Sequence, residues 1–369
     1  MRLHAVREGR RMSFSSVGRI GCLALIVATV GGCGTATTNP VSGSPTPSGE
    51  PSAEPTAQPY AGPTAVAFAG PPAGSVSIPA TAVAVTQPIE LEVGGSTMWV
   101  IAGSDVAGID VATSKVTPLG LVGYGSLDNL AVTPTAIWVA DFSADKVLKI
   151  DPATGKIVDN INTGAPEGVL SVGGAIWVTN HHEGSVTRLD ATTDKPIGTV
   201  VVGLRDSGGP QELVEGAGSV WTDESNTSEV IRMDPATGAV QAHILMPGDF
   251  VPCGGIAASA AAVWVTGCHE TNTMVRIDPT TNAVVADIRL GNFSQDPLVI
   301  DGFLWVAVGG DGDRHELERI NPTTNLVDRV LRLDALVDVG GASVAGGDYW
   351  IANSTNTVLR VPLSQLTAP

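Results

Sequence analysis

The chain has 369 residues and carries 37 Asp and Glu against 20 Lys and Arg, a formal net charge of -17. Nucleic-acid binding depends largely on Lys and Arg that neutralise phosphates, so this balance excludes a nucleic-acid partner. Hydrophobic residues make up 43% of the chain, which is enough to bury a large core, while 44 Gly and 25 Pro favour many turns and few long helices. We therefore expect an all-β protein.

Residues 1–32 have the pattern of an export signal. Five arginines precede an apolar run from Cys22 to Val30, which is too short for a transmembrane helix. The run ends in Val30-Gly31-Gly32-Cys33, which resembles the lipobox of bacterial lipoproteins. The resemblance implies cleavage before Cys33 and attachment of lipid such as palmitate there, so that the protein lies outside the cytoplasm, anchored to the bacterial cell membrane.

An ordinary signal peptide followed by a chance cysteine is the alternative interpretation. The pair Arg10-Arg11 leaves export in the folded state open beside the general route. Residues 33–73 follow with many Pro, Ser and Thr, and repeated prolines block both helix and sheet. We expect this stretch to be a disordered, polyproline-II-leaning linker and the folded domain to occupy residues 74–369.

The tryptophans of the folded part repeat at one period. They are Trp99, Trp138, Trp177, Trp221, Trp264, Trp305 and Trp350, spaced 39 to 45 residues apart, and they are all the tryptophans of the chain. A repeat of this length is typical of propellers and solenoids. We interpret the indoles as packing residues between repeats rather than as ligand-stacking groups.

Each repeat has the same order of segments, as in AIWVADFSADKVLKIDPATGKIV. A strand around Trp is followed by a polar loop, an alternating strand that ends in Asp or Asn, a Pro-x-Thr-Gly/Asn turn and another β-branched strand. With a short strand ahead of Trp, such as 168–172, each repeat has four strands, the size of a propeller blade. The sequence predicts a seven-bladed β-propeller of four-stranded antiparallel blades.

The last repeat has inner strands near 341–345, 349–353 and 357–361, but too few residues follow for a fourth strand. The segment Ser75 to Ile78, ahead of the first repeat, resembles an outer strand. We expect it to pair with 357–361 and close the ring, which removes exposed sheet edges.

The WVA/WVT strands and the R/K-I-D-P-x-T-G/N turns resemble the YVTN and streptogramin (virginiamycin B) lyase-like superfamily of seven-bladed propellers, over about residues 75 to 361. The resemblance implies a scaffold, since members of the superfamily differ in function. Its lyases use a His and Glu set with magnesium near the axis. No His stands at the start of an inner strand here, so those catalytic residues match no position of this chain.

Polar residues stand at the starts of several inner strands, where the axis of the ring opens: Asp128, Glu167, Gln211, Asp296 and Asp338. Acidic groups that converge on one mouth repel one another, and a bound cation or cationic ligand would relieve the repulsion. The alternative is that these groups only hydrate the mouth.

The loops after the tryptophan strands lie on the same face and hold further candidates: His181, His182, Glu183, His269, Glu270, His315 and Glu316. Imidazole and carboxylate groups suit divalent cations and acid–base chemistry. Because no tight ligand spacing appears, we interpret these residues as solvated rim loops, with a metal or acid–base site as the alternative.

Two cysteines remain beside Cys22 and Cys33. Cys253 opens the inner strand of the fifth repeat and Cys268 closes the next strand, so a hairpin centred near 260–261 places them opposite each other. We expect a disulfide, because an exported protein is free to oxidise the pair. Two reduced, buried thiols are the alternative.

These features predict a membrane-anchored, monomeric, extracytoplasmic propeller that binds a protein, peptide or envelope glycan through its loop-rich face. The alternative is a cation-dependent extracytoplasmic lyase or hydrolase similar to streptogramin lyase. No cofactor is expected, except for a divalent cation under the alternative. A quinone is not expected, because the Trp that normally follows the turn of quinoprotein propellers is missing here.

Overall fold

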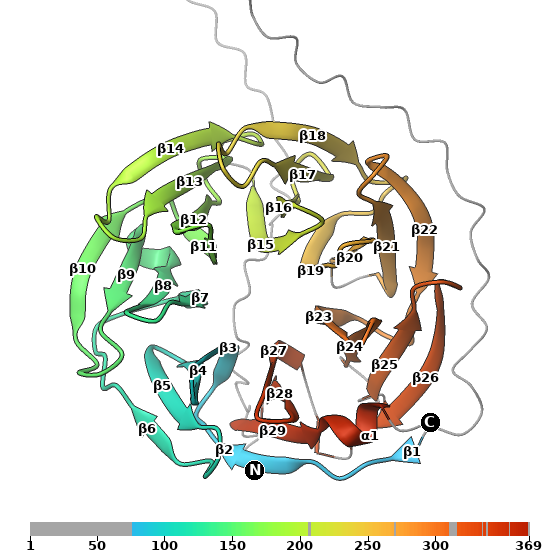
Figure 1. The fold of residues 1–369 in the computed structure, drawn as a ribbon, viewed down its shortest axis with the longest axis horizontal. Helices are drawn as coiled ribbons and strands as arrows, with labels where there is room; N and C mark the ends of the chain where they lie inside the picture. Colours follow the sequence, from blue (N-terminus) through green and yellow to red (C-terminus); the bar gives the residue numbers. More distant parts are fainter. Residues whose placement is uncertain are drawn as a thin grey trace, which may run out of the picture. The chain divides into compact units, whose positions relative to one another are not determined.

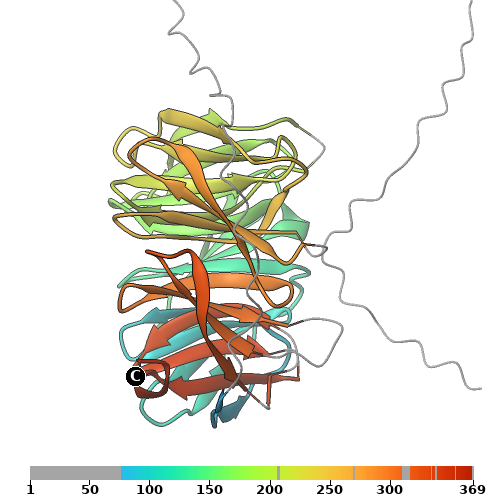
Figure 2. The same ribbon diagram turned by 90° about the vertical axis from the view of Figure 1, so that its right-hand side faces the viewer.

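The computed structural model describes residues 76–205, 208–268, 271–309, 316–333, 335–336, 339–353 and 355–367. These residues belong to one compact unit, an all-β propeller of seven blades around a central axis, as predicted (Figure 1). The strands run between the two faces of the ring (Figure 2). Helical structure in this part is limited to η1 (Phe142–Ala144) and α1 (Leu363–Thr367). None of the described helices has the length and apolar character needed to cross a bilayer.

Each blade has four strands, which we call A to D from the axis outward. Blade one contains β3 (Pro88–Gly94), β4 (Thr97–Ala102), β5 (Asp105–Asp110) and β6 (Val116–Pro118). Blade two contains β7 (Leu127–Val132), β8 (Ile137–Asp141), β9 (Lys146–Ile150) and β10 (Ile157–Asn162). Blade three contains β11 (Pro166–Val172), β12 (Ala175–Asn180), β13 (Ser185–Asp190) and β14 (Pro196–Val201).

The other blades repeat this order. Blade four contains β15 (Pro210–Gly216), β16 (Ser219–Glu224), β17 (Glu229–Met233) and β18 (Val240–Leu245). Blade five contains β19 (Pro252–Ala258), β20 (Val263–Gly267), β21 (Thr273–Asp278) and β22 (Ala283–Arg289). Blade six contains β23 (Ser294–Ile300), β24 (Phe303–Val308), β25 (Glu316–Asn321) and β26 (Leu326–Arg332). Blade seven contains β27 (Val339–Ala345), β28 (Asp348–Asn353) and β29 (Thr357–Pro362), with β2 (Thr81–Ala84) as its outer strand.

The ring is closed by an N-terminal strand, but by a later one than the sequence analysis predicted. β2 pairs antiparallel with β29, so Thr81–Ala84 completes blade seven. The expected closing segment, Ser75 to Ile78, was wrong in this detail: its described part forms β1 (Val76–Ser77), which runs parallel to β26 as a fifth strand of blade six. The two strands differ in burial, since Val83 of β2 is buried whereas both residues of β1 are exposed. Ile78, directly after β1, is buried as well, in the core shared by blades six and seven, so the two segments differ in the blade they join: β1 extends blade six and β2 completes blade seven.

Each tryptophan packs against the following blade. Trp138 lies in a cluster with Val169 and Ile176 of blade three, and Trp221 lies with Val263 and Val275 of blade five. The last indole, Trp350, packs with Leu91 and Met98 of blade one and joins the ends of the ring. The indoles are packing groups between blades, as the period predicts.

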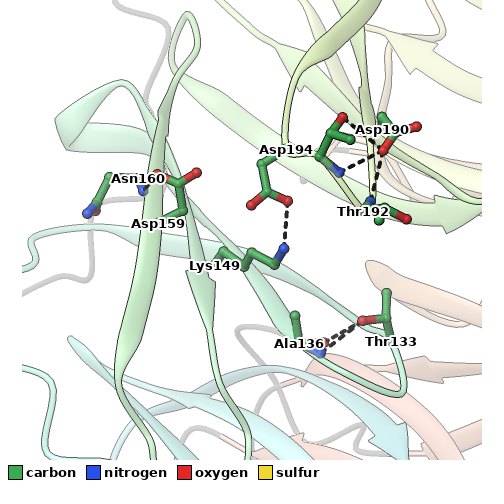
Figure 3. Close-up of polar contacts among 9 residues, drawn as sticks. Thr133, Ala136, Lys149, Asp159, Asn160, Asp190, Thr192 and Asp194 are labelled. Atoms are coloured by element: carbon green, nitrogen blue, oxygen red, sulfur yellow. Dashed lines mark hydrogen bonds and ion pairs between the residues drawn. The ribbon is translucent and has the colours of Figure 1, made fainter.

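A Lys or Arg of strand C covers several of these indoles and reaches the next blade. Arg188 lies 5.0 Å from the centroid of the Trp177 ring and donates to the carbonyl of Ala236 in blade four at 2.7 Å. Lys149 covers Trp138 in the same way and reaches Asp194 of blade three at 2.6 Å (Figure 3). We call this arrangement the latch, because cation, indole and neighbouring turn hold two blades together.

The disulfide between Cys253 and Cys268 is confirmed, with the Cα atoms 5.0 Å apart. It links the start of β19 to the residue after β20, at the loop-bearing end of blade five. By the loop-closure account, a bridge over about 15 residues contributes roughly 3 kcal/mol.

The two N-terminal strands give a test of which one closes the ring. Val83→Asp places a charge in the buried seam between blades seven and one, so the free energy of unfolding should fall by about 3 kcal/mol. Val76→Asp is the matched control, because Val76 is 56% exposed and its loss should change stability by less than about 0.5 kcal/mol. Urea unfolding followed by tryptophan fluorescence measures both. Equal losses for the two variants would contradict closure by β2.

Candidate functional site

The start of strand A and the end of strand B lie side by side in each blade. In blade three Pro166 pairs with Asn180, and His181 donates its backbone N–H to the carbonyl of Ala165. This register brings Glu167 and His181 together, with Nδ1 of His181 2.6 Å from Oε2 of Glu167. One residue predicted for the mouth thus contacts one predicted for the rim.

Asp128 of blade two belongs to the same group of charges. Burial and the nearby Glu167 carboxylate raise the pKa of Asp128 to about 7. Burial opposes the charge on His181, but the Glu167 carboxylate together with Asp223 and Glu224 outweighs it, so the pKa of His181 is raised. We call Asp128, Glu167 and His181 the mouth cluster. It can share protons near neutral pH, which is the property of an acid–base site and also of a site that takes a cation.

Aromatic rings stand beside the mouth cluster. The ring of Phe142 lies 5.8 Å from that of His181 and 5.3 Å from that of His182, edge to face in both cases. His182 is exposed, whereas His181 is only 7% exposed. The two adjacent histidines therefore differ in environment, and only His181 belongs to the mouth.

Asp296 lies one residue further along its strand than Asp128 and Glu167 do along theirs, and it interacts with two carboxyl groups that the sequence analysis missed. Burial raises the pKa of Asp296 to about 7. Burial and the Asp296 charge raise the pKa of Glu90 and that of Glu212 well above the ordinary value. We call Glu90, Glu212 and Asp296 the axial carboxyl group. They come from blades one, four and six and stay half-buried, which places them around the axis.

Contacts between blades show how tightly the axial side chains meet. Asn129 of blade two donates from Nδ2 to Oε2 of Glu212 in blade four at 3.1 Å, past Gly168 of blade three. Gly341 of blade seven leaves room for Glu90, because a Cβ there would lie 2.3 Å from Oε1 of Glu90. The small residues at this level let carboxyl groups of distant blades share one space.

Three fully buried acids surround these groups at the ends of the B strands. Asp141 accepts from the N–H of Ala144 at 3.2 Å, and Asp223 accepts from the N–H of Glu212 at 2.8 Å. Glu224 accepts from the N–H of Thr227 at 2.6 Å. In each of these acids the second carboxylate oxygen is buried without a partner among the described residues. Burial raises the pKa of Asp223 to about 7.

Three other predicted residues that the structure describes make contacts outside the mouth cluster. The half-buried Gln211 offers its backbone carbonyl to Thr179 of blade three at 2.8 Å. Glu183 pairs with Arg205, and Glu316 lies 3.7 Å from Arg332, so both are in ion pairs at the rim. The remaining predicted residues, Asp338, His269, Glu270, His315 and the lipidation candidate Cys33, lie outside the described residues.

The sequence held a signal for the missed pairings. Residues at the start of strand A face the end of strand B of the same blade, so Glu167 was bound to meet His181 once a hairpin was assumed. The same rule places Glu212 beside Asp223.

Within the described part of the chain, no group of three His, Cys, Asp or Glu side chains is arranged to hold a metal ion. What the site offers is a set of half-buried and buried carboxyl groups with one imidazole. Such a set can bind a positively charged group, or exchange protons with a ligand at neutral pH.

Comparisons with known proteins identify the scaffold. No protein-family profile matches the chain, and no curated protein matches it. Among solved structures it is similar to Kuenenia stuttgartiensis hydrazine synthase at 15% identity and a TM-score of 0.64, over 75% of this chain and 96% of that chain. A chain of a mitotic checkpoint complex is 11% identical with a TM-score of 0.65, over 84% of this chain and 99% of that chain. The Neurospora crassa Pan2 WD40 domain is 9% identical with a TM-score of 0.61, over 77% of this chain and 94% of that chain. Identities this low show a shared propeller fold only.

The raised pKa values make stability depend on pH. A carboxyl group whose folded pKa is about 7 binds more protons folded than unfolded between about pH 4 and 7, so stability falls as pH rises through that window. The exposed turn aspartates act oppositely: hydrogen bonds from their turns lower their pKa, so their contribution is lost on acidification below about pH 4. We expect the greatest stability near pH 5.

Asp296→Asn tests this account. The free energy of unfolding of the variant should exceed that of the wild type at pH 8, because the variant lacks one buried carboxylate. Between pH 5 and pH 8 this free energy should fall by on the order of 2 kcal/mol less in the variant than in the wild type. Urea unfolding at pH 5, 6.5 and 8 gives the comparison. Asp249→Asn, at an exposed position, is the control and should keep the wild-type dependence. An unchanged dependence in Asp296→Asn would refute the placement of a repelled charge at the axis.

Proposed function

We propose that this protein is a binding module outside the cytoplasm, anchored to the cell membrane by lipid on Cys33. In this proposal residues 1–32 are the lipoprotein signal, 33–73 are the linker and 74–369 are the propeller. The propeller would belong to the YVTN and streptogramin lyase-like group, which the WVA/WVT strands and the DPxTG/N turns support.

The ligand in this proposal is a protein, peptide or envelope glycan that presents a positively charged group to the loop-rich face. The observation that carries it is the mouth cluster, where Asp128 with a pKa of about 7 lies beside the Glu167–His181 pair. Burial and then the nearby Glu167 carboxylate hold this pKa high, so the charged form of Asp128 is short of counter-charge. A cationic group of a ligand supplies that charge, and the acidic balance of the chain favours its approach.

A second function is favoured by the same pair of side chains. Glu167 and His181 at 2.6 Å, with Asp128 near them, have the composition of a general acid–base site. A cation-dependent lyase or hydrolase would need a divalent ion in addition. The two functions differ in what the mouth requires: the binding module responds to cationic ligands, and the enzyme to magnesium or calcium.

Thermal unfolding with added cations tests the proposal. Tri-lysine, magnesium and calcium are titrated separately, and EDTA is added as the reverse test. Tri-lysine should raise the melting temperature of the wild type. A ligand that binds the folded protein and is present at a hundred times its Kd adds about 2.7 kcal/mol to the free energy of unfolding. In Asp128→Asn/Glu167→Gln the gain should vanish. The control Glu215→Gln/Asp301→Asn removes the same charge from exposed positions and should keep the gain.

The outcomes separate the two functions. A gain with tri-lysine that the mouth variant loses supports the binding module, whereas a gain only with magnesium or calcium, reversed by EDTA, favours the enzyme. No gain with any cation, or an equal gain in the mouth variant, would refute a cation-binding mouth.

Anchoring has its own test. Cys33→Ala should move the protein from the membrane fraction to the soluble fraction and abolish labelling with a palmitate analogue, because the acyl chains hold the protein at the bilayer. Cys22→Ala, which changes a cysteine inside the apolar run, should leave both unchanged. Membrane retention of Cys33→Ala would contradict a lipid anchor on this residue.

A further inference from the structure

Blades two to seven share a feature that blade one lacks. In each of them a cationic residue of strand C stands opposite the tryptophan of strand B: Lys149, Arg188, Arg232, Arg276, Arg319 and Arg360. Five of these cations lie between 4.3 and 5.9 Å from the centroid of the indole ring. The covered ring face and the cation form the latch described above.

In blade one the residue opposite Trp99 is Gly108. The backbone gives no reason for a glycine there, because Gly108 does not adopt a positive φ. Trp99 is also the most exposed of the seven indoles, at 7% against at most 2% for the others. Blade one therefore keeps the aromatic half of the latch without its cation.

A pocket lies where that cation would be. It has a volume of about 430 Å³ and is lined by Trp99, Gly108 and the turn from Pro152 to Gly155 of blade two. This size lies within the range of pockets that hold small ligands. The side facing blade two matches the other blades, since Ala153 has the place in its turn that Ala236 has in the turn of blade four. The carbonyl of Ala236 accepts from the Arg188 guanidinium at 2.7 Å.

The charges that line the pocket do not oppose a cation from outside the chain. Asp110 and Lys115 line the pocket and offset each other, and hydrogen bonds from Thr113 keep the pKa of Asp110 low, so this acid stays ionised. The chain as a whole is strongly acidic. A positively charged group that enters the pocket meets an aromatic face on one side and turn carbonyls on the other, as the Arg188 side chain does in blade three.

We propose that this pocket binds the guanidinium group of an arginine presented by a partner polypeptide, which completes the latch between blades one and two. The turn after strand C lies at the opposite end of the blade from the loop before strand C, so this site is on the other face from the mouth cluster. It is therefore independent of the proposed function.

The test uses two peptides of closely similar shape, acetyl-Gly-Arg-Gly-amide and acetyl-Gly-citrulline-Gly-amide, in which a neutral urea replaces the guanidinium, with binding measured by calorimetry. The arginine peptide should bind the wild type at least about tenfold more tightly than the citrulline peptide, which lacks the cation. Gly108→Arg supplies the chain's own cation and, added to Asp128→Asn/Glu167→Gln so that the mouth cluster takes no part, should abolish binding. Gly198→Arg adds the same charge at an exposed glycine of β14, where a Cβ meets nothing within 4 Å, and should leave binding unchanged.

A second readout does not depend on the folding of Gly108→Arg, whose Cβ would lie 3.0 Å from the Trp99 ring. In protein labelled with 5-fluorotryptophan, the fluorine signal of Trp99, assigned with Trp99→Phe, should shift when the arginine peptide is added, while the other indole signals stay. Asp128→Asn/Glu167→Gln, which removes the charges of the mouth cluster, should still bind the arginine peptide and show the same shift of the Trp99 signal. Equal affinity for the citrulline peptide, an unmoved Trp99 signal, or loss of binding in the mouth variant would overturn the proposal.

Discussion

The contact between the tryptophan of one blade and the core of the next is the constraint on which this ring depends. Each indole is buried between two sheets, so no blade can be removed without exposing an aromatic surface on its neighbour. The contact is repeated around the axis, and Trp350 carries it from blade seven back to blade one. Closure of the ring is therefore a packing requirement as well as a matter of strand pairing.

The latch also fixes the orientation of neighbouring blades relative to each other. An indole alone tolerates small rotations between sheets, whereas a guanidinium over the ring with a carbonyl of the next turn fixes both position and angle. Arg232 shows this most fully, since it covers Trp221 and donates to the carbonyl of Pro279 and to Oδ1 of Asn282 in blade five. The Pro-x-Thr-Gly/Asn turn thus serves as an acceptor for the preceding blade in addition to reversing the chain.

The architecture could be predicted from the sequence because its signal is periodic: seven tryptophans and four Pro-x-Thr-Gly/Asn turns repeat along one chain and define the blade. The closing strand could not, because 75–78 and 81–84 are both short and each buries one apolar side chain, Ile78 or Val83, in a core that exists only in the closed ring. Glu90 and Glu212 were missed for a related reason. Their strands carry a register shift near the mouth, at Pro88/Leu91 and Pro210/Leu213, so counting residues does not show which side chain faces the axis.

The mouth and the axis combine groups that would not stay ionised together at neutral pH. The pKa values of Asp128, Asp223 and Asp296 are each raised to about 7. The rest of the fold is held together by apolar packing and by the latches. The buried carboxyl groups thus destabilise the centre of the ring, and the interfaces between blades stabilise the fold. That division is typical of a functional centre supported by a rigid frame.

The route of the chain into the ring has a mechanical consequence. The described chain enters along the perimeter, first as β1 on blade six and then as β2 on blade seven, before it reaches β3 at the axis. Tension applied from the N-terminal side acts first on the two residue pairs of β1 with β26, and next on β2 with β29. Because β2 is the strand that closes blade seven, the seam sealed by Val83 would open under force ahead of the remaining blades.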